Sequence, residues 1–487
     1  MSSTNALQFR TGISGAFIAP LVFLIGATIH FVFFNAFDMN ALTMSALVGL
    51  LLAALLAVDY QQFWDSVIAG IATPIAITVT LILFIVGPLA SLVESTGVSE
   101  GFVWLASELG VGGDAFPAIV FVAACAMSMS TGTSLGTMFT AYPIFYPAGA
   151  ALDAEPSLLA GAILSGALFG DSLAPISDTS IVSATTQRYR TRDGVADVGG
   201  VVAARAKYAL SAALISFVAY LVIGMVFWSG DSESTAQAAD ASPRGLVMLI
   251  PIVALFIVAF VKRDLYLAIT VGIIGGTVTA LISGLMTPSD IASAEDGVAE
   301  GFLIAGVADM LPLIGLSLMV FGMLGVLQAA GVLELIITKI SSSKFANTPA
   351  GAEVAIGGGQ SIVTGLFAGV VGPSIVTFGP VVDRIGASVG LHPYRRANVM
   401  DCCAMGVACV LPALSAFLFI AGDLTSGVEG MPGLSPVSVF AACFYPMALT
   451  VLMVISIATG WGRTFEGDDG AQVKDQAAAH VFSDRAS

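Results

Sequence analysis

Residues 170–180 read Gly-Asp-Ser-Leu-Ala-Pro-Ile-Ser-Asp-Thr-Ser and lie at the end of a long apolar run. They place two carboxylates, Asp171 and Asp178, and several hydroxyl groups around the helix-breaking Pro175. A charged side chain at the centre of a bilayer costs about 2.5 kcal/mol or more, so acids in such a run are functional candidates. Carboxylate and hydroxyl oxygens are suitable ligands for a small hard cation. The segment therefore predicts an ion-coupled transport site.

The composition of the whole chain is that of a membrane protein. Of its 487 residues, 57% are apolar and only 10% are charged, too few to solvate the surface of a soluble protein of this size. Apolar runs of about 20 residues, the length that crosses a hydrocarbon core, recur from end to end. The first run, 13–37, is too long for the core of a signal peptide and is expected to be retained. We therefore expect an all-α polytopic protein embedded in a lipid bilayer.

Hydropathy predicts ten membrane spans and two broken segments. The spans are expected at 13–37, 41–58, 66–93, 157–187, 207–229, 244–262, 264–286, 302–328, 397–425 and 436–460. The broken segments, 115–151 and 350–388, each join two short apolar arms through a middle rich in glycine and hydroxyl residues. Irregular backbone at membrane depth requires cover from protein or a wet cavity. Both segments are therefore expected to be re-entrant hairpins or discontinuous helices at a binding site.

The distribution of basic residues predicts the orientation. They are concentrated at Arg10, 188–207, 262–263, 339–344, 384–396 and Arg463. The loops at 94–114, 230–243, 287–301 and 421–435 are acidic or neutral, apart from Arg244 at a span edge. Threading the spans and hairpins places every basic group in the cytoplasm, as the positive-inside rule requires. Residues 1–12 and the acidic tail 464–487 are thus both expected on the cytoplasmic side of the cell membrane.

The chain also repeats itself. Three prolines recur at a displacement of 237 residues, namely Pro143, Pro156 and Pro175 as Pro380, Pro393 and Pro412. The matches coincide with the two broken segments and the spans after them. An external linker, 231–243, then separates two halves, 13–230 and 244–463, each with five spans and one hairpin. Because five is odd, the second half is inverted, which predicts an inverted-topology repeat with substrate near the midplane.

The chemistry of the broken elements centres on Asp171. Pro175 has no N–H to donate to the Asp171 carbonyl, so that carbonyl and the carboxylate are both free to coordinate a dehydrated cation. A membrane-buried aspartate that binds a proton and a cation in turn is sufficient for antiport. Alternatively, Asp171 caps a half-helix and Asp178 lies near the cytoplasmic end of the span.

Further ligands are expected from hydroxyl groups nearby. The candidates in the first half are Ser172, Ser177, Thr179, Thr131, Thr133, Ser134 and Thr137. The candidates in the second half are Asp401, Ser374, Thr377 and Asp309. For Asp401 a functional role and burial beside Arg395 or Arg396 are equally open.

Several classes of function are disfavoured. The net charge of −16 argues against nucleic-acid binding and favours a salt-loving source whose surfaces carboxylates keep hydrated. The five cysteines and three histidines lack metal-ligand spacing, so neither a metal cage, a disulfide framework nor a cofactor is expected. An intramembrane aspartyl protease needs aspartates on separate spans, whereas Asp171 and Asp178 share one. We therefore expect a carrier, not an enzyme.

Two motifs together resemble a known family. Residues 132–137, Gly-Thr-Ser-Leu-Gly-Thr, and residues 169–179, Phe-Gly-Asp-Ser-Leu-Ala-Pro-Ile-Ser-Asp-Thr, are similar in pattern and spacing to the NhaC family of sodium/proton antiporters. The resemblance implies export of Na⁺ or Li⁺ driven by inward H⁺, with the transported Na⁺ at Asp171 and Asp178. The chain departs from the family at Ala174, where relatives usually carry serine, and at Ser180, which replaces a threonine. Asp401 also stands alone where relatives often have an acidic pair.

These departures bear on the substrate more than on the fold. The alternative is a Na⁺- or H⁺-coupled exchanger of a small organic acid or amino acid on the same scaffold. Such a carrier needs a cationic group for the substrate carboxylate, and only Arg384 is a candidate, although a half-helix N-terminus could substitute. This favours the inorganic cation. The sequence leaves open the coupling ratio, the ion preference and whether the protein forms a homodimer.

Overall fold

The computed structural model describes residues 6–30, 34, 39–97, 104, 112–227, 243–262, 264–295, 298–332, 335, 344–412, 414–426, 428 and 431–476. Six helices in this part of the chain are long and apolar enough to cross a membrane. They are Met39–Leu56, Ala76–Ser95, Pro156–Thr185, Val198–Val226, Tyr266–Ser283 and Phe302–Ala329, of which the third is interrupted at 174–177. The all-α polytopic prediction is thereby confirmed. The linker expected at 231–243 lies outside the described residues except for Pro243.

Both halves of the chain are built from helices. The first half contains η1 (Gly12–Phe17), α1 (Ile18–Thr28), α2 (Met39–Leu56), α3 (Tyr60–Ile71), α4 (Pro74–Ser95), α6 (Phe116–Thr131), α7 (Ser134–Ala151), α8 (Pro156–Leu173), α9 (Asp178–Thr185) and α10 (Val198–Phe227). The second half contains η5 (Pro243–Met248), α11 (Leu249–Lys262), α12 (Leu265–Ser283), α13 (Pro288–Ile291), α14 (Phe302–Ala329), η6 (Lys344–Asn347), α16 (Pro349–Leu366), α17 (Val371–Ser388), α18 (Pro393–Ala404), η7 (Val407–Val410), α19 (Ala416–Leu424), α20 (Pro436–Ala441) and α21 (Phe444–Thr459).

The span expected at 66–93 is divided in two, which corrects the prediction. Asp59 caps α3, accepting hydrogen bonds from the N–H groups of Gln61 and Gln62, and this helix ends at Ile71. Thr73 is extended, with ψ of 143°, because a residue before proline avoids the helical region, and α4 then begins at Pro74. Residues 66–71 therefore belong to α3, and α4 alone provides the span.

The last two expected spans are also interrupted. The span at 397–425 consists of α18, η7 and α19, and that at 436–460 of α20 and α21. In the second interruption the Tyr220 hydroxyl donates to the Ala442 carbonyl (2.7 Å) and accepts from the Phe444 N–H (3.4 Å). Backbone groups freed by the break are thus satisfied by a side chain from α10.

The two broken segments are pairs of helices. A two-residue turn at 132–133 joins α6 to α7, and residues 367–370 join α16 to α17. The second helices, α7 (Ser134–Ala151) and α17 (Val371–Ser388), begin and end at positions 237 residues apart. The following helices, α8 and α18, begin at Pro156 and Pro393 with the same displacement. The proline repeat in the sequence therefore corresponds to repeated helix boundaries.

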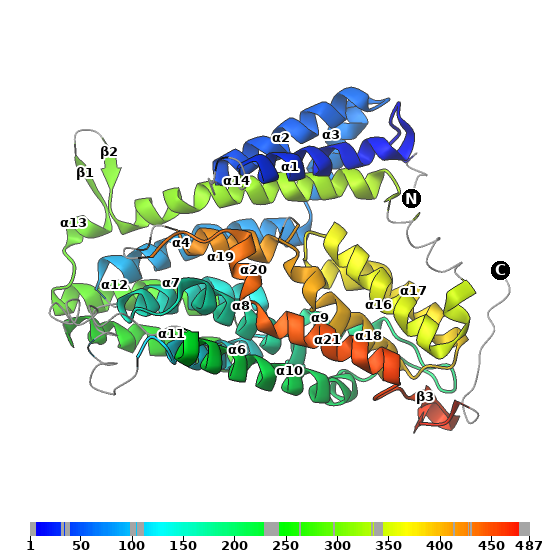
Figure 1. Cartoon of the computed structure of the whole chain (residues 1–487). Coiled ribbons are helices and arrows are strands. Elements are labelled where there is room, and N and C mark those ends of the chain that lie inside the picture. Colours follow the sequence, from blue (N-terminus) through cyan, green and yellow to red (C-terminus); the bar gives the residue numbers. More distant parts are fainter. Residues whose placement is uncertain are drawn as a thin grey trace.

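The helices form two groups. Figure 1 shows α1, α2 and α3 lying along α14 on one side of the molecule, and the hairpins and broken helices gathered on the other. α4 lies between them, in contact with α14 and α7. Two small sheets complete the fold, one pairing β1 (Ser293–Glu295) with β2 (Val298–Glu300) and the other pairing β3 (Phe465–Glu466) with β4 (Gln472–Val473).

Part of the segment expected as an acidic tail is folded against the helices. Phe465 forms a β-bridge with Leu391, and the Glu466 N–H donates to the Gly390 carbonyl (2.9 Å). The Glu466 carboxylate is buried and accepts hydrogen bonds from the N–H groups of Arg190 (2.6 Å) and Thr191 (2.8 Å). We call residues 463–473 the strap. It joins the loop before α10 to the turn between α17 and α18.

Candidate cation site at the broken helix

The break between α8 and α9 follows directly from the sequence. Ala174 precedes Pro175 and is extended, with ψ of 125°, so α8 ends at Leu173. Ser177 restarts the helix as the N-cap of α9, its hydroxyl accepting from the Thr179 N–H (3.2 Å). The chain is therefore unwound over residues 174–177, and the two aspartates fall on either side of the gap.

Asp171 lies in the last turn of α8 and is only 4% exposed. Its Oδ2 accepts a hydrogen bond from the Ser134 hydroxyl (2.7 Å), and its Oδ1 accepts a short one from the Ser177 hydroxyl. The Thr179 hydroxyl lies 3.5 Å from both Oδ1 and the Asp171 carbonyl oxygen. The carbonyl that Pro175 cannot bond is thus within reach of a hydroxyl. One buried carboxylate is surrounded by three hydroxyl groups and its own carbonyl.

Asp178 is the first residue of α9, and its side chain is exposed. Its Oδ1 accepts from the Thr179 N–H (2.9 Å), as an acid at a helix N-terminus often does. Its Oδ2 lies 3.0 Å from the position that a Cβ on Gly372 would occupy. Gly372 is in the first turn of α17, so Asp178 lies between the two halves of the chain. The two aspartates therefore have different surroundings.

The tip of the first hairpin packs onto the gap. Gly132 is left-handed, with φ of +69°, and ends α6. A Cβ at this position would lie 2.9 Å from the Ile176 side chain and 3.1 Å from the Ser177 nitrogen. Glycine thus permits both the turn and the close approach. The approach brings Ser134, at the start of α7, to Asp171.

The other hydroxyl candidates of the first half do not bond to Asp171. Thr131 bonds to the Met127 carbonyl (3.2 Å), and Thr137 bonds to the Thr133 carbonyl (2.9 Å). Thr133 caps α7 by accepting from the Gly136 N–H (3.3 Å). These three stabilise the hairpin tip. The buried Ser172 hydroxyl has no hydrogen-bond partner among the described residues.

The second-half candidates lie apart from the Asp171 hydrogen bonds. Ser374 accepts a hydrogen bond from the Gln360 amide (2.8 Å), and Thr377 bonds to the Pro373 carbonyl within α17. Asp309 is exposed on α14 and interacts electrostatically with Asp423, not with Asp171. Gln360, which is fully buried, was not among the candidates.

Asp401 has a different partner from those expected. Its Oδ2 lies 3.0 Å from Nη1 of Arg205, and both side chains are fully buried. Arg395 pairs instead with Glu353 (2.7 Å) and Arg396 with Asp383 (3.5 Å). Burial of Asp401 beside Arg395 or Arg396 is therefore wrong.

The charge pattern predicted that Arg205 lies in a loop, but it lies in α10. α10 begins at Val198, nine residues before the expected span, and the Asp197 carboxylate stabilises this start by accepting a hydrogen bond from the Gly200 N–H (2.7 Å). An arginine within the apolar run from 201 to 220 was a signal for a buried charge, and it was missed. Its other partners, Asn398, Ser180 and Ser183, were missed with it.

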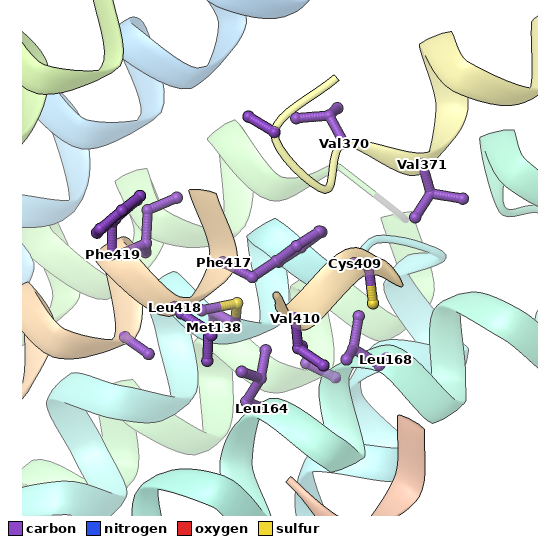
Figure 2. Close-up of a cluster of buried hydrophobic side chains, with 14 of the residues drawn as sticks. Met138, Leu164, Leu168, Val370, Val371, Cys409, Val410, Phe417, Leu418 and Phe419 are labelled. Carbon is purple, nitrogen blue, oxygen red and sulfur yellow. The ribbon is translucent and has the colours of Figure 1, made fainter. Parts of the chain in front are cut away.

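An apolar layer lies between the two halves near the site. Figure 2 shows Met138, Leu164 and Leu168 gathered with Val370, Val371, Cys409, Val410 and Phe417 in one buried cluster. Most of these side chains are less than 5% exposed. Such a layer keeps water away and strengthens electrostatic interactions with a bound ion.

The chain has recognisable relatives. Residues 7–198 match the model of the "Na+/H+ antiporter family". The chain is 26% identical over 314 residues to the malate-2H(+)/Na(+)-lactate antiporter of Bacillus subtilis, covering 61% of this chain and 65% of that protein. It is 24% identical over 237 residues to the Na(+)/H(+) antiporter NhaC of Alkalihalophilus pseudofirmus, covering 44% and 48%.

A third relative is similar over more of its length. The arginine/ornithine antiporter ArcD of Halobacterium salinarum is 25% identical over 425 residues, covering 82% of each chain. The matched family region includes α6, α7, α8 and α9, which form the candidate site. Residues 7–198 therefore match the Na⁺/H⁺ antiporter family model, and the resemblance to NhaC-type antiporters is confirmed.

Proposed function

We propose that the protein exchanges Na⁺ or Li⁺ for H⁺ across the cell membrane, and that Asp171 binds the cation and the proton in turn. The observation that carries this is the buried Asp171 carboxylate, with the Ser134 and Ser177 hydroxyls directed at it. The match of residues 7–198 to the antiporter family model supports the same reaction.

The hydroxyl groups suit both states of such a carrier. A hydroxyl has one donor and two acceptor sites, so the hydrogens that now point at Asp171 can rotate away and present lone pairs to Na⁺. The Asp171 carboxylate, its carbonyl and the hydroxyls of Ser134, Ser177 and Thr179 supply the hard oxygen ligands. When Na⁺ leaves, a proton on the carboxylate replaces the lost positive charge. Na⁺ and H⁺ therefore compete for one site.

Asp178 is assigned a supporting role. It is exposed beside α17, so it attracts a cation toward Asp171 without enclosing it.

We further propose that the halves form an inverted repeat, supported by the helix boundaries displaced by 237 residues. We place both termini in the cytoplasm, and the start of α1 and β3 lie toward the same end of the molecule in Figure 1. No resident cofactor enters the proposed cycle.

The test is Na⁺-driven proton movement in proteoliposomes that contain a pH-sensitive dye. The wild type is expected to respond to Na⁺ or Li⁺. The transport rate of Asp171→Asn is expected to be at least about 100-fold lower, because asparagine cannot exchange a proton. Asp264→Asn is the matched control, since Asp264 is an exposed N-cap of α12 and asparagine caps equally well. A wild type that does not respond to either ion overturns the proposal.

Exchange of a small organic acid or amino acid, recognised by its carboxylate, is the second candidate. It is favoured by one observation, that α7, α9 and α17 all begin at the gap, where helix N-termini attract negative groups. Two relatives bear the names of malate/lactate and arginine/ornithine antiporters. Against it, the buried Arg205 is already bound to protein groups through Nε, Nη1 and Nη2. A dye response to malate, lactate or arginine, with none to Na⁺ alone, would favour this candidate.

A further inference from the structure

Arg205 is a fully buried cation that joins the broken helix to the second half of the chain. Its Nη1 donates to the Ser172 carbonyl (2.7 Å) and to the Ser180 hydroxyl (3.2 Å). Its Nη2 donates to the Ser183 hydroxyl (2.9 Å) and its Nε to Asn398 Oδ1 (3.0 Å). One guanidinium thus contacts α8, α9 and α18.

The Ser172 contact places positive charge at the end of α8. The last carbonyls of a helix lack intrahelical partners and carry partial negative charge, and a cation there is stabilising. Ser172 directly follows Asp171, so the same contact fixes the backbone that carries the proposed ion-binding carboxylate. Arg205 is therefore placed to position Asp171 without touching it.

Asp401 lies beside Arg205 but is held by charge alone. Nη1 is 3.0 Å from Asp401 Oδ2, yet its hydrogens point at Ser172 and Ser180, and neither Asp401 oxygen accepts a hydrogen bond from the described residues. The other titratable groups that face Asp401 are Asp171, Asp178, Cys402 and Tyr445. Asp171 is faced by Asp178, Asp401 and Cys409.

The charge count follows from these neighbours. The cluster holds three carboxylates and one guanidinium, and the guanidinium does not lose its proton in a protein. Arg205 therefore balances one acid permanently. Asp401 is the acid in direct contact, which leaves Asp171 and Asp178 as the two carboxylates whose charge can be balanced by transported ions.

We infer that Arg205 and Asp401 form a fixed ion pair that positions the end of α8 and limits the exchangeable charge at the site to Asp171 and Asp178. The inference rests on the proposed function. It assigns Arg205 as a positioning residue and Asp401 as its counter-charge. Asp401 then carries neither Na⁺ nor H⁺ in the cycle.

The test compares four variants with the wild type in the dye assay, over a series of Na⁺ concentrations and pH values. Asp401→Asn keeps the shape of the side chain but leaves the positive charge of Arg205 without its counter-charge, and this charge repels Na⁺. We expect the KM for Na⁺ to rise at least about 10-fold and the pH of half-maximal rate to fall by about one unit. Arg205→Gln leaves Asp401 unbalanced, and its pH profile is expected to move in the opposite direction.

The double variant Arg205→Gln/Asp401→Asn separates charge from structure. Removing both charges restores the balance, so its KM and pH profile are expected to return to within about 3-fold and half a unit of the wild type. The maximal rate stays low, because the Ser172 carbonyl has lost its donor. Arg205→Lys keeps the charge and is expected to keep the wild-type KM with a lower maximal rate, since an ammonium cannot reach all the partners of the guanidinium.

The results have distinct meanings. An Asp401→Asn variant with unchanged KM and pH profile overturns the inference. So does a double variant whose KM and pH profile differ from the wild type as much as those of the more strongly affected single variant. Thermal unfolding of each purified variant shows whether it is folded. If the arginine variants do not fold, the nearly isosteric Asp401→Asn variant alone tests the inference. A wild type without any Na⁺ response overturns the proposed function instead.

Discussion

Asp171 and Asp178 lie seven residues apart in one sequence motif, and the motif alone does not distinguish them. In the structure their side chains have different surroundings. Asp171 is 4% exposed and accepts hydrogen bonds from two elements, α7 and the gap before α9. Asp178 is exposed at the start of a helix. Competition between Na⁺ and H⁺ is strongest where water is excluded, which supports Asp171 as the ion carrier.

The Ser177 hydroxyl offers a direct test of this environment. Ser177→Ala removes a hydrogen bond to the Asp171 carboxylate, and bonds to charged groups are worth about 1.5–3 kcal/mol. We expect the KM for Na⁺ in the dye assay to rise about 10-fold, and Ser177→Thr, which keeps a hydroxyl, to restore most of the affinity. Ser388→Ala, at an exposed hydroxyl of α17, serves as the control. Equal KM values for Ser177→Ala and the control would remove Ser177 from the site.

His392 provides a pH-dependent contribution to stability outside the membrane-spanning segments. Its Nδ1 accepts from the Tyr394 N–H (3.1 Å) and its Nε2 contacts the strap carbonyl of Gly470 (3.1 Å), which requires a neutral ring. Burial, with a smaller effect of the nearby Arg396, lowers the pKa of His392 to about 4. In the unfolded chain the histidine pKa is about 6.5.

The direction of the effect follows from these two values. Between pH 6.5 and about 4 the unfolded chain binds a proton that the folded protein does not, so stability is lost as the pH falls. The loss amounts to about 3 kcal/mol at most. We expect the melting temperature of the purified protein to fall between pH 7 and pH 4.5, and to fall less in His392→Gln. The same pH dependence in both proteins would contradict this role.

The residues of the site were only partly predictable from the sequence. Asp171, Ser177 and Thr179 lie in one short motif, and Pro175 indicated the break, so local chemistry was enough. Ser134 was expected among four hydroxyls of the hairpin tip, but only packing of the tip on the gap distinguishes it from Thr131 and Thr137. Arg205 depends on contacts with α8, α9 and α18, which no local pattern specifies.

At the scale of elements, the site is assembled from helix ends. α8 ends and α9 begins at the gap, α7 begins at Ser134, and α17 begins next to Asp178. The glycines Gly132 and Gly372 allow these ends to meet, because any side chain would enter the space between them. Their role is one of close approach and not of flexibility.

Gly372→Ala tests the contact between α17 and α9. A Cβ at this position would be 3.0 Å from Asp178 Oδ2, so the carboxylate has to move, whereas alanine favours the helix itself. We expect the KM for Na⁺ to rise about 3-fold or more with no loss of thermal stability. Gly358→Ala on α16, where a Cβ meets nothing within 4 Å, is the matched control. An unchanged KM in Gly372→Ala would show that Asp178 takes no part in cation binding.

Across the whole molecule, buried ion pairs join segments far apart in the sequence. Glu353 of α16 accepts from Arg395 of α18 (2.7 Å) and from Arg463 of the strap (2.7 Å), and is fully buried. Asp383 of α17 similarly binds Arg190 (2.6 Å) of the loop before α10. These pairs hold the second hairpin to its neighbours at the end where the strap lies.

Removal of the Glu353 charge is therefore expected to be costly. Glu353→Gln leaves two arginines without their carboxylate, and breaking one partner of a buried pair typically costs about 3–5 kcal/mol. The melting temperature should fall clearly below that of the wild type, while Glu300→Gln, at an exposed position of β2, should leave it unchanged. Equal melting temperatures for the two variants would mean that water or other groups replace the lost charge.

At this largest scale, composition and hydropathy predicted the helical membrane architecture and both hairpins, because each depends on runs of apolar residues and on glycine or proline breaks. The division of 66–93 at Thr73 and the folded strap were not foreseen. The first depends on a single proline inside an apolar run, and the second on burial of Glu466 against a distant loop.

The most direct test of the central claim is the number of protons released when Na⁺ binds to the purified protein, measured with a pH indicator in weakly buffered detergent solution. If one carboxylate binds the two ions in turn, Na⁺ releases protons from the wild type and from Asp264→Asn, but not from Asp171→Asn. Proton release that persists in Asp171→Asn, or Na⁺ binding to the wild type without any release, would contradict the account.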